Sequence, residues 1–190
     1  MPAFRTISHI PVGVYGNVRI FATKAEYIPK PLYQPNVLTD IAFDAETIHE
    51  EDKRFISTDK SFSVEGAECR TGEEAYEGSY SAKLSPQSPF AFTVTLENIK
   101  PGEFIQVSGM RKGKDGLLVA SGVKEGAFYK TSQQISRDKG WDVLDLQFTV
   151  PAKLPQKKLK LYIWYNGSDS AYFDNFRIIR REEYQKRNGL

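Results

Sequence analysis

Several stretches of the chain alternate between apolar and polar residues with a period of two, which is the pattern of a strand with one buried face. In the run LKLYIWY, the alternation separates an aliphatic face from a face that carries Lys160, Tyr162 and Trp164. The run FAFTVTLENI shows the same period, and its predicted buried face consists of Phe90, Phe92, Val94 and Leu96.

Roughly eight short strands of this kind, separated by turn residues every roughly 8–15 positions, predict an all-β fold: an antiparallel β-sandwich of the jelly-roll type. Helical composition is confined to residues 46–55 and to the tail that begins at Arg181. The alternation of strands with longer helices that marks the α/β classes is missing, which excludes those folds.

The segment PKPLYQP contains three prolines in seven residues. Proline fixes the backbone and lacks an N–H donor, so this segment is predicted to be an extended connector. We therefore expect a strand-containing N-terminal extension over residues 1–35, the β-sandwich over residues 36–180, and a polar C-terminal tail over residues 181–190. The extension is too short to hold a core of its own, so it either packs on the sandwich or links it to something upstream.

The formal net charge of +2 gives no reason to expect nucleic acid or an anionic membrane as a partner. No run approaches the roughly 18 apolar residues that span a bilayer, so direct membrane insertion is not expected. The single cysteine, Cys69, excludes an internal disulfide, which fits a reducing compartment and also many exported bacterial proteins. The N-terminus lacks an apolar signal-peptide core, so the chain is either cytoplasmic or a mature piece of a longer exported protein.

Residues with the spacing of a catalytic centre are missing from the sequence. The paired carboxylates that glycoside hydrolysis needs do not stand out, because the acidic runs lie in predicted loops. The two histidines, His9 and His49, fit no metal-binding pattern, and the signature of a phosphate-binding loop is absent. We therefore expect a chain that is not an enzyme.

Four segments, in chain order, carry a resemblance: DIAFDAET (40–47), GEEAYEGSYSAKLS (72–85), GWDVLDLQFTVPA (140–152) and LKLYIWYNGSDSAYFDNFRII (159–179). They resemble strands of galactose-binding-domain-like jelly rolls, and among these the carbohydrate-binding modules of families 4, 9 and 22. The resemblance covers about residues 36–180. It implies non-catalytic recognition of a glycan on the concave face of the sandwich, and an extracytoplasmic location in the periplasm or on the cell surface.

The same resemblance implies a structural calcium ion near Asp174, an acid inside the last predicted strand. The implied ligands are Asp174, an acid of the opening strand that is either Asp44 or Glu46, and backbone carbonyls of residues 74–79. Calcium binds six to eight oxygen ligands, and loop carbonyls with one or two carboxylates supply them. The alternative is that Asp174 caps a turn or pairs with a lysine or arginine.

The implied glycan site needs exposed aromatic rings with polar side chains beside them. Tyr162 and Trp164 are the predicted platform, with Gln106 and Arg111 expected from a neighbouring strand and Tyr129 as a further candidate. The alternative is that both faces of this sheet are covered by other parts of the protein.

Two other functions stay open at this stage. The chain is alternatively a spacer or interaction domain of a larger surface or periplasmic protein, with no sugar ligand, because one fold hosts many functions. It is otherwise an accessory domain of a glycan-active enzyme whose catalytic part lies outside this chain. Under both alternatives, its partners are other domains of a longer protein.

Overall fold

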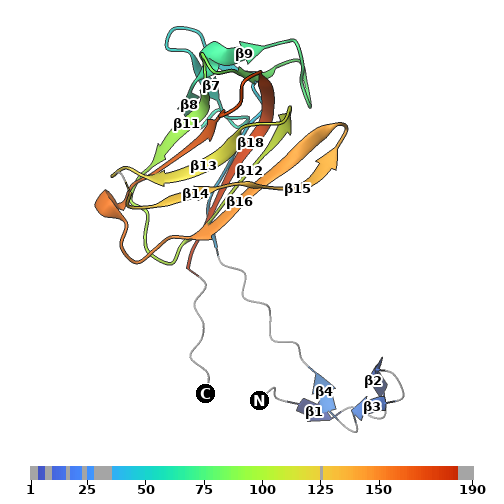
Figure 1. Cartoon of the computed structure of the whole chain (residues 1–190). Helices are drawn as coiled ribbons and strands as arrows, with labels where there is room; N and C mark the ends of the chain where they lie inside the picture. The colour runs from blue at the N-terminus through green and yellow to red at the C-terminus, as the bar shows by residue number, and fades with distance from the viewer. Residues whose placement is uncertain are drawn as a thin grey trace. The chain divides into compact units, whose positions relative to one another are not determined.

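The computed structural model describes residues 36–124 and 126–183 in full, and the backbone of four short strands before them (Figure 1). These four strands are β1 (Phe4–Thr6), β2 (Ile10–Tyr15), β3 (Val18–Ala22) and β4 (Ala25–Tyr27). Strand β1 pairs antiparallel with β4, and β2 pairs antiparallel with β3. The chain divides into two compact units, Met1–Gln34 and Pro35–Leu190.

Two seven-stranded sheets form the larger unit. The first, called here the β12 sheet, consists of β15 (Gln133–Asp138), β16 (Trp141–Thr149), β12 (Phe104–Lys112), β18 (Ala171–Arg181), β10 (Ser81–Leu84), β9 (Arg70–Thr71) and β5 (Val37–Phe43). The second, called the β17 sheet, consists of β14 (Tyr129–Thr131), β13 (Leu117–Gly122), β17 (Leu159–Trp164), β11 (Phe90–Leu96), β8 (Ser63–Glu65), β7 (Arg54–Ile56) and β6 (Ile48–His49). Two short 3-10 helices, η1 (Ala67–Cys69) and η2 (Pro155–Lys157), lie between strands.

The chain crosses repeatedly from one sheet to the other. Strand β10 of the β12 sheet leads to β11 of the β17 sheet, and the next two strands, β12 and β13, repeat the crossing. The strand pairs of both sheets are antiparallel, and Figure 1 shows the sheets as two layers. The prediction of an antiparallel β-sandwich of the jelly-roll type is confirmed.

Aromatic rings join the two sheets across the core. Phe55 stacks on Phe92 with ring centroids 4.3 Å apart, and Phe92 stacks on Phe176 of the opposite sheet at 5.4 Å. Phe43 adds a tilted contact with Phe176 at 6.2 Å. All four side chains are at most 1% exposed. Burial of each ring stabilises the fold by about 1.5–3 kcal/mol, so this cluster is a main link between the two sheets.

Strand β11 contains a β-bulge that changes the predicted register. The pairing with β17 shifts between Ala91 and Val94, and Phe92 takes a positive φ of 48°. Ala91 and Phe92 are therefore both fully buried, whereas Phe90 is 50% exposed. The prediction that Phe90 shares the buried face was wrong, because a bulge turns the residues before it to the other face of the sheet.

The segment 46–55, whose composition is helical, instead forms strand β6, a turn and the start of β7. Ile48 pairs with Phe55 across this hairpin, and the Phe55 ring enters the core. Core burial therefore overrides the local helical preference. The tail after residue 183, also of helical composition, lies outside the described residues.

The two ends of the sandwich lie side by side. The backbone N–H of Glu182 donates to the carbonyl of Asn36 at 3.0 Å, and the Asn36 amide donates to the Glu182 carboxylate at 2.9 Å. The first and last strands of the sandwich, β5 and β18, are therefore neighbours in the β12 sheet. Among the residues that the structure describes, no helix is long and apolar enough to cross a membrane.

Candidate functional site

Strand β17 divides its side chains between the core and the outer face of its sheet. Its first, third and fifth residues are buried, and Lys160, Tyr162 and Trp164 lie on the other side of the strand, where they are partly or fully exposed. The alternation predicted from the sequence is confirmed. The two aromatic side chains therefore share the outer face of the β17 sheet.

Neighbouring strands add two more rings to this face. Phe90 lies opposite Trp164 on β11, and its ring meets Tyr162 edge-on with centroids 5.8 Å apart. Tyr129 lies opposite Ser121, which in turn lies opposite Lys160. Phe90 is 50% and Tyr129 54% exposed. We call the four residues Phe90, Tyr129, Tyr162 and Trp164 the aromatic face.

A hollow of about 490 Å³ opens on the aromatic face. Its lining combines the rings of Phe90 and Tyr162 with Gly66 and with polar and charged side chains from β8, η1, β11, β13 and β17: Glu65, Glu68, Thr93, Ser121 and Lys160. The Lys160 ammonium lies 5.7 Å from the centroid of the Tyr162 ring. Rings beside hydroxyl, carboxylate and ammonium groups are the combination that fixes a polar ligand with apolar faces.

A glycine closes one wall of the hollow. Gly66 adopts a φ of +104°, and a Cβ added there would lie 2.9 Å from the Cα of Ala91. Only glycine takes this conformation without strain and lets the two backbones approach so closely. The turn before η1 is therefore held tightly against β11, next to Phe90.

The surroundings of the Tyr129 phenol on the aromatic face change its acidity. Burial of its hydroxyl end raises the pKa of Tyr129, and the neighbouring Tyr162 adds a smaller rise. The Tyr129 hydroxyl is thus partly shielded even though 54% of the residue is exposed. The Tyr129 phenol therefore stays protonated at neutral pH and is able to donate a hydrogen bond.

Gln106 and Arg111 do not join this face. They lie on β12, in the opposite sheet, because the chain crosses between the sheets after Lys112. Their predicted position on a strand next to Tyr162 and Trp164 was wrong. Arg111 is 8% exposed, and its guanidinium donates to Asp142 at 2.7 Å and to the Gly116 carbonyl at 2.8 Å. The Gln106 amide donates to Asp145 at 2.7 Å on the outer face of the β12 sheet.

Asp174 is fully buried in β18 and accepts three backbone hydrogen bonds. Its Oδ2 accepts the N–H groups of Tyr76 at 2.9 Å and Glu77 at 3.3 Å, and its Oδ1 accepts the N–H of Asn175 at 2.7 Å. Burial, together with a smaller effect of the nearby Asp44, raises the pKa of Asp174 to about 6 against the pull of these bonds. The carboxylate therefore anchors the loop that contains Tyr76.

The other two predicted metal ligands lie near the same loop. Glu46 Oε1 accepts the N–H groups of Ser79 at 2.7 Å and Tyr80 at 2.8 Å. Asp44 Oδ1 accepts the N–H of Glu46 at 3.0 Å. Within 36–124 and 126–183, no three side chains of His, Cys, Asp or Glu gather closely enough to hold a metal ion. Any ion there would depend on backbone carbonyls for most of its ligands.

Comparison with known proteins gives structural neighbours and no sequence relatives. The chain matches no protein-family model and no curated protein. It is similar in structure to the CBM22-1 xylan-binding domain of Paenibacillus barcinonensis Xyn10C, with 16% identity, a TM-score of 0.49, and coverage of 78% of this chain and 96% of that one.

Two further neighbours are also carbohydrate-binding modules, the class whose motifs the sequence resembles. The C-terminal family 22 module of Clostridium thermocellum Xyn10B has 17% identity and a TM-score of 0.44, over 57% of this chain and 77% of that one. TmCBM61, solved with β-1,4-galactotriose, has 16% identity and a TM-score of 0.38, over 63% and 81%. At these identities and TM-scores, the likeness gives no information about the ligand of this chain.

Proposed function

We propose that the sandwich binds a glycan chain, without catalysing a reaction on it, at the aromatic face. The observation that carries this proposal is the pair of rings, Phe90 and Tyr162, that line a hollow with polar walls on the aromatic face. Flat rings stack on the apolar C–H faces of a pyranose, and hydroxyl, carboxylate and ammonium groups beside them bind its hydroxyls. Thr93, Ser121 and Lys160 line the same hollow as Tyr162, and their polar groups are available to hydrogen-bond the sugar hydroxyls.

The acids of the hollow support a role in binding and not in hydrolysis. A general acid for glycoside cleavage is a shielded carboxyl group whose surroundings favour the protonated form. The Glu65 side chain is 67% exposed and lies 3.5 Å from the Arg54 guanidinium. Glu68 is exposed as well. Both carboxylates are therefore suited to accept hydrogen bonds from sugar hydroxyls.

We also propose a structural calcium ion held by Asp44, Asp174 and carbonyl oxygens of residues 74–79. The two carboxylates lie close enough for Asp44 to raise the pKa of Asp174, and Asp174 is fully buried. Such a pair gains from a cation that neutralises it. Glu46 is the other candidate ligand. Its Oε1 already accepts two N–H groups, as the Asp174 carboxylate accepts three, so either acid would share its oxygens between the ion and these hydrogen bonds. The ion would supply positive charge that ties the loop to β5 and β18.

A protein that binds such a glycan is expected outside the cytoplasm, where structural polysaccharides are found. Its expected partners are other domains that act on the same polymer. The specific alternative is a spacer domain with no sugar ligand. The rings of the aromatic face would then have no ligand, and their removal would change no binding property.

The test is retention on insoluble polysaccharides (xylan, cellulose, mannan and galactan), measured by pull-down for the wild type, Tyr162→Ala and Tyr172→Ala. Tyr172 is the matched control, since it is a half-buried tyrosine on the opposite sheet that donates to Glu73 at 2.7 Å. We expect the wild type and Tyr172→Ala to be retained on at least one polymer, and Tyr162→Ala to be retained less than either. Equal retention of all three proteins would contradict the proposed site, and no retention of the wild type would favour the spacer.

A further inference from the structure

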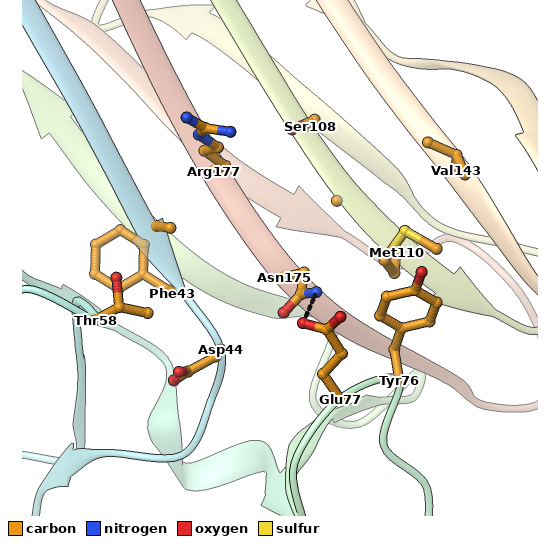
Figure 2. Close-up of a pocket in the computed structure, with 12 residues that line it drawn as sticks. Phe43, Asp44, Thr58, Tyr76, Glu77, Ser108, Met110, Val143, Asn175 and Arg177 are labelled. Carbon is orange, nitrogen blue, oxygen red and sulfur yellow. Dashed lines mark hydrogen bonds between the residues drawn. The ribbon is translucent and has the colours of Figure 1, made fainter. Parts of the chain in front are cut away.

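A second hollow, of about 480 Å³, lies on the outer face of the β12 sheet, on the opposite side of the sandwich from the aromatic face (Figure 2). Strands β5, β12, β16 and β18 form its floor, and the segment around Thr58 and the loop with Tyr76 and Glu77 form its walls. It is therefore separate from the site proposed above, and its residues have no part in that site.

One wall of this hollow is an aromatic ring that is held firmly in place. The Tyr76 hydroxyl donates to Asp138, and the ring meets Trp141 edge-on with centroids 6.0 Å apart. The Lys139 ammonium lies 4.9 Å from the Tyr76 ring centroid. Trp141 is only 3% exposed. A ring fixed in this way loses little conformational entropy when a ligand stacks against it.

The floor beside this ring is apolar. Met110 and Val143 lie on it, and Figure 2 shows Met110 and Tyr76 on the same side of the hollow. Ser108, from the same strand as Met110, adds one hydroxyl and lies between Asp145 and Arg177 in the sheet. The hollow thus offers an apolar floor and an aromatic wall to one ligand.

Polar groups stand beside Tyr76 and on the far rim of the hollow. The Asn175 amide donates to Glu77 at 3.1 Å (Figure 2). Arg177 makes a two-pronged ion pair with Asp40, at 2.8 and 2.7 Å, which neutralises its charge. Asp44 is assigned to the proposed calcium ion, so Glu77 is the remaining charged side chain of the lining, and the hollow is acidic. It favours ligands that donate hydrogen bonds and carry no negative charge.

We propose that this hollow is a second sugar-binding site, which takes a neutral sugar unit and disfavours uronic acids. A pyranose matches it chemically, since it has an apolar C–H face for the ring and floor, and hydroxyl donors for the Glu77 carboxylate and the Asn175 amide oxygen. The proposal rests on the proposed function, because it assumes that the chain meets glycans at all. With two sites on opposite faces, one molecule bridges two glycan chains or binds one polymer with avidity.

The test is isothermal titration with neutral oligosaccharides (xylohexaose, cellohexaose, mannohexaose and β-1,4-galactotriose), each alone. For the oligosaccharide that the wild type binds, we expect two molecules per chain. Tyr162→Ala should leave one, which is bound in the second hollow. Tyr76→Ala should also leave one, and so should Ser108→Tyr, which adds a large side chain to the hollow from a half-buried position on the strand and leaves the sequence of the loop unchanged.

Three results would overturn the second site. The first is that the wild type binds one molecule per chain, Ser108→Tyr also binds one, and Tyr162→Ala binds none. This result would agree with the proposed function and would overturn the second sugar-binding site. Two molecules per chain in both Tyr76→Ala and Ser108→Tyr would place the second ligand elsewhere. No binding of any of the four oligosaccharides by the wild type would overturn the second site together with the proposed function.

Discussion

The buried carboxylate of Asp174 accepts the backbone N–H of Tyr76 at 2.9 Å, across 98 positions of sequence. An acid of the last strand thereby fixes the loop whose ring forms a wall of the second hollow. Both Asp174 oxygens accept hydrogen bonds, and the nearby Asp44 disfavours the negative charge of Asp174. The protonation state of the Asp174 carboxyl group should therefore control the stability of the loop.

The stability of the metal-free protein should depend on the protonation of Asp174. Its pKa rises from the ordinary 3.8 to about 6 in the folded state, so the folded state binds the proton more tightly than the unfolded state. The stability that this provides is complete below pH 3.8 and is lost as the pH rises through about 6. Chemical unfolding in chelator between pH 4.5 and 7.5 should show a loss of at most about 3 kcal/mol in the wild type that is absent in Asp174→Asn.

Asp59 is the control with the opposite sign. Hydrogen bonds from the hydroxyls of Ser57 and Ser61 lower its pKa to about 2. The stability that it contributes is therefore present above its ordinary pKa and is lost only as the pH falls toward 2. Asp59→Asn should keep the pH dependence of the wild type between pH 4.5 and 7.5. Identical profiles for the wild type and Asp174→Asn would show that Asp174 ionises without cost.

Calcium should stabilise the wild type and not the variants that lack its proposed ligands. A cation between Asp44 and Asp174 removes their repulsion and binds the folded state only, so it raises the melting temperature by mass action. At 100 times its dissociation constant, calcium should add about 2.7 kcal/mol of unfolding free energy. Thermal unfolding with calcium and with excess chelator, on the wild type, Asp44→Asn and Asp174→Asn, measures this. Equal melting temperatures of the wild type with calcium and with chelator would contradict the proposed calcium site.

The bulge in β11 makes a prediction about two neighbouring phenylalanines. Phe92 is fully buried between Phe55 and Phe176, so Phe92→Ala should lower the unfolding free energy by about 3–5 kcal/mol. Phe90 is 50% exposed, and Phe90→Ala should lower it by less than about 1 kcal/mol. Urea unfolding of the two variants measures the difference. Large losses in both would support the unbulged register, with both rings in the core.

The loop between β9 and β10 depends on a glycine beside Glu46. Gly78 has a φ of +68°, and an added Cβ would lie 2.3 Å from Glu46 Oε1, the atom that accepts the Ser79 and Tyr80 N–H groups. Gly126 has a similar φ of +71° with nothing within 4 Å. Gly126→Ala should lower the free energy of unfolding by about 1 kcal/mol, because alanine is strained at this positive φ. Gly78→Ala should cost more, because it also displaces Glu46; equal losses by thermal unfolding would mean that Glu46 does not hold the loop.

Patterns local to one strand predicted much of this structure. The alternation in residues 159–165 correctly separated the core side chains of β17 from Tyr162 and Trp164. The register of Phe90 could not be predicted, because the bulge at Phe92 forms only when that ring packs between Phe55 and Phe176 in the core. The ligand role of each of these residues stays a prediction.

Features that depend on topology were not accessible from the sequence. Gln106 and Arg111 lie on a predicted strand, as Tyr162 does, but the strand pattern does not indicate which sheet the strand joins. The chain crosses between the sheets after Lys112, and no local sequence signal marks that crossing. The wall formed by Tyr76 was missed for a similar reason. It stands in a loop, and its position depends on Asp174 and Asp138, which are distant in sequence.

The most direct test of the central claim uses Phe90, which the fold and not the sequence pattern brings to the aromatic face. Isothermal titration should compare Phe90→Ala with the wild type and the control Tyr172→Ala, with the oligosaccharide that the wild type binds most tightly. A stacking ring contributes about 1.4 kcal/mol of binding free energy, so Phe90→Ala should bind the oligosaccharide on the aromatic face about tenfold more weakly than the wild type. Tyr172→Ala should bind it with the affinity of the wild type. Affinities equal to that of the wild type in Phe90→Ala would contradict glycan binding on the aromatic face.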